Sequence, residues 1–550
     1  MNDLKNQDIL ILGLGISGLA MARWCTRQGA RVVVADTREQ PPHLDTLRQE
    51  CPHATFLCGP FDESLLGRHS WHLIARSPGL PPQQLDQVRR HAQSTGGQLV
   101  SELDLFARAL ADLSAREPLP YRPKVLAITG TNGKTTVTSL TGLLMERCGW
   151  RTAVAGNIGP TLLDVLTQAL DHEACASVED ERQEASEASD GHLADDAPPP
   201  PPIQPPHLPQ VWVLELSSFQ LDGTAGGDWD AVPTAATVLN LSEDHLDWHG
   251  SMDAYVQAKQ AIFGRDALML LNRDDSQVMA MEPGLVTVKI SGRNRQAPAR
   301  PWTSFGLDAP RRPGEWGVES VNGMDWLVRA VALDETRKQG RSADEEEEVW
   351  LQRLMPADAL RIRGRHNAAN ALAALALATS TGASLAPMLH GLREYRGEPH
   401  RVEPVGIIDE VEYFDDSKGT NVGATLAAVE GLGAGRRLVV ILGGDGKGQD
   451  FAPLAQPLSR HARAVVLIGR DAAVIRAQVE QPGLPVVDAT TMADAVRLCA
   501  SHARSGDAVL LSPACASLDM YDDYVHRARV FVQAVAELAA ERGQDLGGTI

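Results

Sequence analysis

Apolar runs of strand length alternate with amphipathic runs of helical length along most of this chain. The first unit has two apolar runs, 8–12 and 31–35, joined by a glycine turn and a helical stretch. The turn at 13–18 has the spacing Gly-x-Gly-x-x-Gly, and the second run is followed by Asp36. Strand, glycine turn, helix and strand in this order form a βαβ unit of the nucleotide-binding type. The pattern predicts a Rossmann-like N-terminal domain.

The same alternation starts again at Lys124, after a polar stretch with three prolines at 117–123, and a third time after Gly397. An alanine- and leucine-rich run at 365–378 predicts a long helix. The further strands that we expect are 124–129, 151–155, 211–216, 235–241, 267–271, 437–442, 464–468 and 508–511. The chain is therefore predicted to be an α/β protein of three domains: a Rossmann-like domain at 1–120, a P-loop-type mononucleotide-binding domain at 121–396, and a Rossmann-like domain at 397–550.

Two acidic segments interrupt this pattern. Residues 171–209 are rich in Glu, Asp, Ser and Ala and then in Pro, a composition too polar to bury a core, so we expect a disordered surface insertion. Residues 344–348 are one Asp and four Glu, and we expect a solvated loop there. Residues 171–210 carry ten acids and one Arg, so they supply −9 of the net charge of −20. The folded body is only mildly acidic.

Length and composition exclude several classes of protein. The 550 residues are too many for one core, and no apolar run is long enough to span a bilayer. The first residues lack the basic and apolar segments of an export signal. Seven cysteines without metal-ligand spacing fit reduced thiols, and the acidic charge disfavours non-specific nucleic-acid binding. We expect a cytoplasmic monomer that binds neither nucleic acid nor membrane.

The stretch 130–136, Gly-Thr-Asn-Gly-Lys-Thr-Thr, carries the strongest chemical signal. It lies between a strand and a helix, where a glycine turn aims backbone N–H groups, the amine of Lys134 and the hydroxyl of Thr135 at one point. Such a geometry suits a polyphosphate and its Mg²⁺. A standard P-loop would have Gly where Ile128 stands. The motif therefore indicates an ATP-using enzyme and leaves its class open.

Two further strand ends carry polar side chains. The strand at 211–216 ends at Glu215, and the strand at 235–241 leads to His245. Both ends are expected at the same sheet edge as the glycine loop, where a carboxylate and an imidazole could hold Mg²⁺. A lone His after a strand is more often structural. Lys259, in a helical run, would ordinarily be a solvated lysine.

Motifs along the whole chain resemble those of the Mur ligases, ATP-dependent enzymes that build the stem peptide of peptidoglycan. The resemblance rests on 130–135, on Gly-Asn-Ile-Gly at 156–159, on Glu-Leu-Ser-Ser-Phe-Gln at 215–220, on Asn-Leu-Ser-Glu-Asp-His at 240–245 and on Gly-Arg-His-Asn-Ala-Ala-Asn at 364–370. Three later motifs resemble the family members that add D-glutamate: Asp-Asp-Ser-Lys-Gly-Thr-Asn at 415–421, Gly-Gly-Asp-Gly-Lys at 443–447 and Ser-Pro-Ala-Cys-Ala-Ser-Leu-Asp at 512–519.

This resemblance implies an ADP-forming amide ligase that joins D-glutamate to UDP-N-acetylmuramoyl-L-alanine through an acyl phosphate. ATP would be bound by Gly130, Thr131, Asn132, Gly133, Lys134, Thr135 and Thr136, with Asn370, Arg401, Asp416 and Lys418. Two Mg²⁺ ions would be held by Thr135, Glu215, His245 and Lys259, and CO₂ would carbamylate Lys259 so that it supplies oxygen ligands. Lys134, His245 and Lys259 would be catalytic.

The resemblance also implies where the two other substrates bind. The UDP-sugar would contact Ile16, Ser17, Asp36, Thr37, Arg38, Ser77, Gly79 and, nearer the reaction centre, Asn157. D-Glutamate would contact Thr420, Lys447, Ser517 and Tyr524. Tyr524 stands where some relatives have Phe, and Gly419 where some have Ala. A contact made by the backbone of residue 524 would be little affected.

Other functions stay open on the residues alone. Ligases that add L-alanine or a diamino acid, or glutamate to folate, would share the central motifs, and only the C-terminal motifs distinguish them. The glycine turn at 13–18 would also suit an NAD-dependent oxidoreductase. A nucleotide-binding regulator would bind ATP without turnover.

Overall fold

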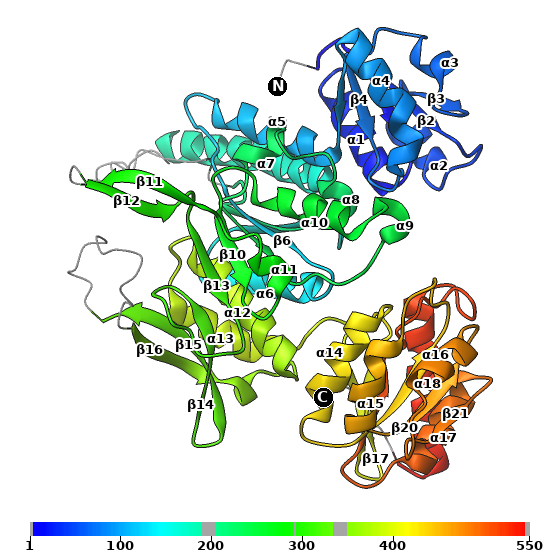
Figure 1. The fold of residues 1–550 in the computed structure, drawn as a ribbon. Helices are drawn as coiled ribbons and strands as arrows, with labels where there is room; N and C mark the ends of the chain where they lie inside the picture. Colours follow the sequence, from blue (N-terminus) through cyan, green and yellow to red (C-terminus); the bar gives the residue numbers. More distant parts are fainter. Residues whose placement is uncertain (1–3, 190–204, 206, 291–292, 334–348, 545–550) are drawn as a thin grey trace.

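Three α/β domains follow one another along the chain (Figure 1). The computed structural model describes residues 4–189, 205, 207–290, 293–333 and 349–544. The domains are built on sheets of five, nine and six strands, and a separate two-stranded hairpin projects from the central domain. The predicted fold class is confirmed.

The N-terminal domain is a parallel sheet in the order β3-β2-β1-β4-β5. The strand order reverses between β1 and β4, so a crevice forms outside their carboxyl ends, and the turn at 13–18 and residues 77–79 lie there. The elements are β1 (Asp8–Leu12), α1 (Ile16–Arg27), β2 (Arg31–Asp36), α2 (Leu44–Glu50), β3 (Thr55–Cys58), α3 (Glu63–Leu66), β4 (Leu73–Arg76), α4 (Asp86–Thr95) and β5 (Gln98–Val100).

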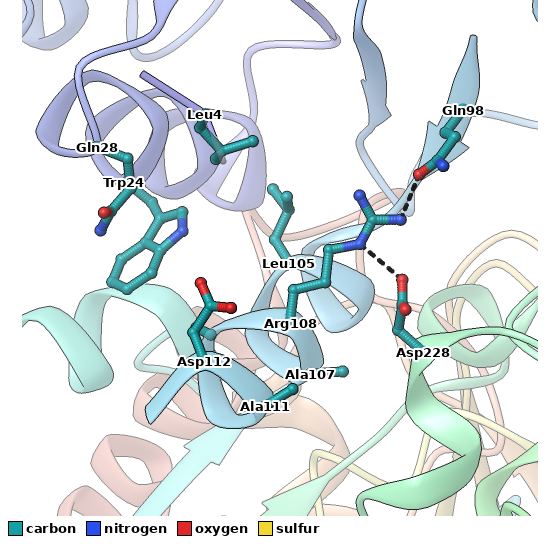
Figure 2. A pocket seen from close by; sticks show the side chains of 11 residues that line it. Leu4, Trp24, Gln28, Gln98, Leu105, Ala107, Arg108, Ala111, Asp112 and Asp228 are labelled. Atoms are coloured by element: carbon teal, nitrogen blue, oxygen red, sulfur yellow. Dashed lines mark hydrogen bonds and ion pairs between the residues drawn. The ribbon is translucent and has the colours of Figure 1, made fainter. Parts of the chain in front are cut away.

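Helix α5 (Glu102–Ser114) links the N-terminal domain to the central one. Ser101 caps it: the Ser101 hydroxyl accepts a hydrogen bond from the amide of Asp104, whose carboxylate accepts one from the Ser101 amide. The helix packs against α1 and α7 (Leu162–Ser189). Figure 2 shows a pocket of about 350 Å³ beside it, where Arg108 bonds to both Gln98 and Asp228. This pocket contains none of the predicted substrate contacts.

The central sheet has the order β16-β15-β14-β13-β10-β9-β6-β8-β7. Its strands are parallel from β7 to β14, and β15 and β16 are antiparallel additions at one edge. Strand β6 buries both faces, with Val125 and Ala127 in one core and Leu126 and Ile128 in another. The strands are β6 (Lys124–Thr129), β7 (Thr152–Gly156), β8 (Val211–Glu215), β9 (Ala235–Val238), β10 (Leu268–Asn272), β13 (Trp302–Phe305), β14 (Trp316–Val321), β15 (Met324–Ala332) and β16 (Val349–Pro356).

Helices cover both faces of this sheet, and the predicted alanine-rich helix is one of them. It forms α12 and packs against α6. Helix α6 lies against β6, β7 and β8, and α12 lies beside it against β9, β10, β13 and β14. The helices are α6 (Lys134–Arg147), α8 (Ser218–Leu221), α9 (Leu246–His249), α10 (Met252–Gln260), α11 (Ser276–Met279), α12 (Arg365–Thr379) and α13 (Leu385–Glu394), besides α7.

Several strands of the central domain are absent from the sequence prediction. They are β13 to β16 and the hairpin of β11 (Leu285–Ile290) and β12 (Arg293–Pro298). Strands β14 to β16 and the hairpin lie at or outside one edge of the sheet and carry charged residues between apolar ones, and β13 beside them is only four residues long with two polar residues. They therefore lack the continuous apolar run that marks a strand buried on both faces.

The expectation of a disordered segment at 171–209 is wrong for its first half, because α7 continues to Ser189. Its Glu- and Ala-rich sequence favours a helix without needing a core. Leu208, near the end of the segment, is buried, and its carbonyl accepts a hydrogen bond from Arg151. Residues 190–204 and 206, and the acidic patch at 344–348, lie outside the described residues. Neither α7 nor any other helix of the described chain is long and apolar enough to cross a membrane.

The C-terminal sheet has the order β17-β18-β22-β19-β20-β21, with only β17 antiparallel to its neighbour. This order places the carboxyl ends of β18, β22 and β19 side by side. The elements are β17 (Glu403–Ile408), β18 (Val411–Asp415), α14 (Val422–Gly433), β19 (Leu438–Gly443), α15 (Ala455–His461), β20 (Ala462–Ile468), α16 (Ala472–Val479), β21 (Val486–Asp488), α17 (Met492–His502), β22 (Ala508–Leu511) and α18 (Tyr524–Glu541).

Replacing Tyr121 by Phe should destabilise the central domain. The buried Tyr121 hydroxyl donates to the carbonyl of Pro209 at 2.6 Å and accepts from Nε1 of Trp212 at 2.8 Å. Phe keeps the ring but leaves the buried indole N–H unpaired, which costs about 1–3 kcal/mol. Denaturant unfolding followed by fluorescence measures the loss.

The matched control is Tyr413→Phe. Tyr413 is equally buried, and its hydroxyl has no hydrogen-bond partner within the described ranges, so this change should leave the midpoint nearly unaltered. An unfolding midpoint of the Y121F variant equal to that of the wild type would contradict the role of this hydrogen bond.

Candidate functional site

The glycine loop at 130–133 runs from the carboxyl end of β6 into the start of α6. Gly133 caps the helix with φ +81°, and Gly130 has φ +155°. A Cβ at Gly133 would lie 2.8 Å from Oδ1 of Asn370. The amide of Asn132 donates to Oδ1 of Asn240, beyond β9, at 2.8 Å. The loop is therefore fixed in place, with a helix N-terminus available to an anion.

Two lysines, the half-buried Lys134 and the buried Lys259, share one carbonyl oxygen of this loop. Nζ of Lys134 donates to the carbonyls of Gly130 at 2.9 Å and Thr131 at 2.8 Å. Nζ of Lys259, from α10, donates to the same Gly130 carbonyl at 2.8 Å. Burial lowers the pKa of both amines, and the nearby Lys134 charge lowers that of Lys259 further. Lys259 is thus a core residue, not the solvated helix lysine that its sequence context suggests.

Glu215 ends β8 beside this pair. Its Oε1 accepts from Nδ2 of Asn157 at 2.9 Å, whereas its Oε2 is buried and lacks a hydrogen-bond partner in the described part of the chain. Gly156, with φ +115°, makes room for this strand end, since a Cβ there would lie 2.2 Å from the Glu215 carbonyl oxygen. A buried carboxylate oxygen without a donor is suited to a hard cation.

His245 lies at the rim of the same site. It has φ +54° and precedes α9, and its ring packs against that of Phe219 with 4.7 Å between centroids. Burial lowers the pKa of His245, Asp244 opposes the shift, and the charges of Lys134 and Lys259 add to it. The neutral imidazole favoured in this way is the form that ligates metals.

The C-terminal domain reaches the loop through Arg401. Nη2 of Arg401 donates to Oγ1 of Thr135 at 2.8 Å, and the side chains of Asn132 and Asn421 also bond across the two domains. The Nε of Arg401 is buried without a partner among the described residues. A small cavity between the two domains is lined by several of the residues predicted to contact ATP: Asn132, Gly133, Thr136, Asn370, Arg401 and Asp416. The structure therefore brings residues of both domains that are predicted to contact ATP around one cavity.

Of the two other predicted ATP contacts in this segment, Asp416 lines the interdomain cavity and Lys418 is not among its lining residues. The buried Asp416 accepts from the Ser512 hydroxyl at 2.6 Å, and burial raises the pKa of its carboxyl to about 7. Nζ of Lys418 lies 5.2 Å from the ring centroid of Tyr524. Lys418 therefore faces a residue predicted to contact D-glutamate.

The residues predicted to contact D-glutamate lie on loops that leave β18, β19 and β22. Asp445 and Ala516 exchange backbone hydrogen bonds of 3.0 and 2.9 Å, which joins the loops that carry Lys447 and Ser517. The Ala514 amide donates to the Gly419 carbonyl at 3.0 Å, beside Thr420. The Ser417 hydroxyl donates to the carbonyl of Tyr524 at 2.9 Å. The strand order thus gathers Thr420, Lys447, Ser517 and Tyr524 at one end of the domain.

Arg527 holds these loops together, and the sequence prediction does not include it. It is fully buried and donates to Oγ of Ser417 at 2.9 Å, to the Ser417 carbonyl at 2.7 Å and to the Cys515 carbonyl at 3.0 Å. Burial lowers its pKa to about 10. Nothing in the helical pattern distinguishes it from the exposed Arg529 two residues later.

His400 is a second residue that the prediction lacks. It precedes Arg401, and its Nδ1 lies 2.7 Å from Oδ2 of the buried Asp415 and 3.8 Å from Oε2 of Glu403. One potential metal-ligand atom from each of these three residues lies within 4.8 Å of the other two. The hydrogen bond between His400 and Asp415 makes this a histidine–carboxylate pair. The only available signal was the position of His400 beside Arg401.

The residues predicted to contact the UDP-sugar in the N-terminal domain include Asp36, which ends β2. Oδ2 of Asp36 accepts hydrogen bonds from the Leu14 amide at 2.7 Å and from Nη2 of Arg38 at 2.8 Å, and Oδ1 accepts one from the Arg38 amide at 2.9 Å. Burial acts to raise the pKa of Asp36, but these bonds outweigh it and hold the pKa at about 2. Both its oxygens are therefore engaged by its own chain. The exposed Ile16 and the loop of Ser77 and Gly79 remain open to a ligand.

Ser17 connects this pocket to the helix between the domains. Its side chain hydrogen-bonds the buried carboxyl of Glu102, at the start of α5, and burial raises the pKa of Glu102 to about 7. Oε1 of Glu102 also accepts from the Leu163 amide of α7. Glu102 thus ties α1, α5 and α7 together, a link that the sequence pattern does not indicate.

Three family models match the chain in the order of its domains. Residues 7–100 match the Mur ligase MurD-like N-terminal domain, 203–304 the Mur ligase middle domain and 400–515 the Mur ligase glutamate ligase domain. A UDP-N-acetylmuramoylalanine–D-glutamate ligase of Albidiferax ferrireducens is 57% identical over 99% of this chain and 98% of its own. Proteins of the same name from a Polaromonas species (50% identical, 99% and 100% covered) and from Paraburkholderia phymatum (49%, 98% and 98%) are also similar.

A solved structure with the same fold is a UDP-N-acetylmuramate–alanine ligase from Thermotoga maritima. It is 17% identical, with 97% of this chain and all of that chain covered, and the TM-score is 0.50. At this identity the likeness concerns the fold alone.

Replacing Gly133 by Ala should weaken the binding of a nucleoside triphosphate about tenfold or more. The left-handed backbone costs a non-glycine residue about 1–2 kcal/mol, and the new Cβ would press on Asn370. Titration calorimetry with a non-hydrolysable ATP analogue measures the change.

The control is Gly149→Ala. Gly149 has φ +80° and open space around its Cβ position, so an Ala there carries the same backbone strain just beyond the C-terminal end of α6, away from the loop. It should bind the analogue as the wild type does. Equal affinities of the G133A variant and the wild type would contradict the geometry assigned to the loop.

Proposed function

The chain belongs to the Mur ligase family, and we infer that it joins D-glutamate to UDP-N-acetylmuramoyl-L-alanine while ATP is converted to ADP and phosphate. Relatives named UDP-N-acetylmuramoylalanine–D-glutamate ligase match 98–99% of this chain at 49–57% identity. The structural observation that carries this function is the contact of Arg401 with Thr135. It joins the phosphate loop to the domain that carries the predicted D-glutamate loops.

ATP is needed because an amine does not attack a carboxylate: oxide is a poor leaving group, and the anion repels the nucleophile. An oxygen of the L-alanyl carboxylate attacks the γ-phosphorus, ADP leaves, and an acyl phosphate forms. The amine of D-glutamate then attacks the carbonyl carbon, and phosphate leaves from the tetrahedral intermediate. An amide bond results.

The residues at the end of β6 supply what the first step requires. Lys134 and the amides at the start of α6 would bind the phosphates, and Arg401 would add positive charge from the other domain. Asn370 and Asp416 line the interdomain cavity on the side where the nucleoside would lie. Acyl phosphates hydrolyse in water, so contact between the domains also serves to exclude it.

The donor set around Glu215 fits Mg²⁺. Thr135, Glu215, His245 and Lys259 would hold two ions, and the unpartnered Oε2 of Glu215 is the observation that favours this assignment. When bound, Mg²⁺ would neutralise charge on the phosphates. The protein's own part is to hold these donors on the ends of β6, β8 and α10.

Lys259 suits this role only as a carbamate, since an ammonium group cannot ligate a cation. A neutral amine adds to CO₂ to give a carbamate and a proton. Burial and the Lys134 charge both lower the pKa of Lys259 and so favour the neutral amine. One N–H would remain to donate to the Gly130 carbonyl, as it does here.

The remaining substrates would occupy the outer domains. The UDP-sugar would lie along the crevice at β1 and β4, with Asn157 near the reaction centre. D-Glutamate would lie among the loops of Thr420, Lys447, Ser517 and Tyr524, where Lys447 could meet a carboxylate. We place the reaction in cytoplasmic peptidoglycan precursor synthesis. The seven free cysteines support a reducing compartment such as the cytoplasm. One chain supplies every predicted contact, consistent with a monomer.

A phosphate-release assay tests this function. Phosphate should be released from ATP only when UDP-N-acetylmuramoyl-L-alanine and D-glutamate are both present, and L-glutamate, L-alanine or a diamino acid should not replace D-glutamate. Phosphate release with a different amino acid would assign the chain to another branch of the family.

Replacing Lys259 by Ala should abolish activity, because it removes the carbamate. A short carboxylic acid added to the assay should restore part of the rate by supplying the missing oxygens. Lys124→Ala, an exposed lysine at the start of the same strand as the loop, should leave the rate unchanged. Near wild-type turnover by the K259A variant would rule out the metal-ligand role.

A further inference from the structure

The second half of the reaction requires a base. D-Glutamate has an α-ammonium group at neutral pH, and nitrogen becomes a nucleophile only after it loses a proton. The residues assigned so far do not suit that task, since Lys134, Arg401 and Lys447 would serve as cations, and His245 and Lys259 would hold the metal ions. An acceptor must lie between the phosphate loop and the D-glutamate loops.

His400 has the structure of such an acceptor. Its Nδ1 pairs with the buried Oδ2 of Asp415 at 2.7 Å, which fixes the ring and directs the lone pair to Nε2. Nε2 has no hydrogen-bond partner in the described part of the protein, and the side chain is 24% exposed. The ring can therefore exchange a proton with a ligand or with solvent.

The backbone holds His400 in this place under strain. Its φ is +63°, a left-handed conformation, and its amide donates to Oε2 of Glu403 at 2.8 Å while its carbonyl accepts from the Lys418 amide at 3.2 Å. Strained residues held by several bonds occur most often at functional sites. The strain and the Asp415 bond are two independent features of one residue.

His400 also lies between the two subsites that the second step must connect. The next residue, Arg401, touches Thr135 of the phosphate loop. On the other side, the His400 ring centroid lies 6.1 Å from that of Tyr524, at the D-glutamate loops. Asp415, Glu403, Lys418, Arg401, Asp416 and Tyr524 are the titratable or charged groups around it. Of these, Asp416 is fully buried and already bonded to Ser512.

We propose that His400 is the general base that takes the proton from the α-ammonium group of D-glutamate, with Asp415 as its positioning residue. Nε2 accepts one proton as the nitrogen lone pair forms the C–N bond with the acyl phosphate. The C–O bond to phosphate then breaks, phosphate leaves with its electron pair, and the amide nitrogen releases its second excess proton to phosphate or water. This inference rests on the proposed function.

Hydroxylamine separates the two halves of the reaction. It is a neutral nucleophile at neutral pH, so it should trap the acyl phosphate as a hydroxamate without a base. The variant His400→Gln should form hydroxamate from UDP-N-acetylmuramoyl-L-alanine and ATP at nearly the wild-type rate. Its kcat with D-glutamate should fall by about 10²–10⁴-fold, the usual contribution of a general base, with KM for ATP little changed.

Two further variants make the result specific. Asp415→Asn keeps the imidazole but alters its orientation and tautomer, so it should also lose D-glutamate transfer more than hydroxamate formation. His461→Gln replaces a histidine of the same domain whose Nδ1 bonds the Gly433 carbonyl, away from the site, and should leave both rates unchanged.

Equal loss of both rates in H400Q with a wild-type unfolding midpoint, or D-glutamate transfer at the wild-type rate in either H400Q or D415N, would overturn the proposal. If H400Q does not fold, D415N decides by the same comparison. Absence of hydroxamate with the wild-type enzyme would instead refute the proposed function. This outcome differs from those that refute the role of His400, so the two failures can be told apart.

Discussion

Positive charge concentrated around one backbone loop is the constraint on which this structure depends. Lys134 and Lys259 donate to the same carbonyl of Gly130, and Arg401 meets the adjacent Thr135. Buried cations are costly unless they are neutralised or paired. The protein lowers the pKa of both lysines and supplies Glu215 nearby. In the proposed function the remaining compensation would come from the substrates, since phosphates and carboxylates are the anions that such a site favours.

Sheet topology delivers each group to this loop. Strands β6, β8 and β9 are neighbours, so the glycine loop, Glu215 and the segment leading to His245 all emerge at one edge. In the C-terminal domain the neighbours β18, β22 and β19 gather the loops predicted to contact D-glutamate, and Arg527 donates hydrogen bonds to two of these loops. The short link through His400 and Arg401 then joins the two centres. Chemistry depends on placing two such edges face to face.

The sequence predicts those parts of the fold that repeat a simple physical pattern. Parallel strands buried on both faces are continuous apolar runs, and all ten that were expected form, as does the alanine-rich α12. Strands β14 to β16, at one side of the sheet, mix charged and apolar residues, and β13 is short and half polar, so none of them gives this signal. Motifs at strand ends indicated the glycine loop and Glu215 as candidates, and the family resemblance indicated Lys259; the structure brings these residues together, and their roles stay predictions. The burial of Lys259, the ties made by Arg527 and Glu102, and the His400–Asp415 pair depend on residues distant in sequence, which no local pattern encodes.

The central claim is that the γ-phosphate of ATP is transferred to a carboxylate, with its charge stabilised by the cationic residues at the loop, before the amide bond forms. It is tested most directly with UDP-N-acetylmuramoyl-L-alanine labelled with ¹⁸O in the L-alanyl carboxylate. After turnover with ATP and D-glutamate, mass spectrometry of the released phosphate should find one ¹⁸O atom from that carboxylate. Unlabelled phosphate with full formation of the amide product would contradict the account.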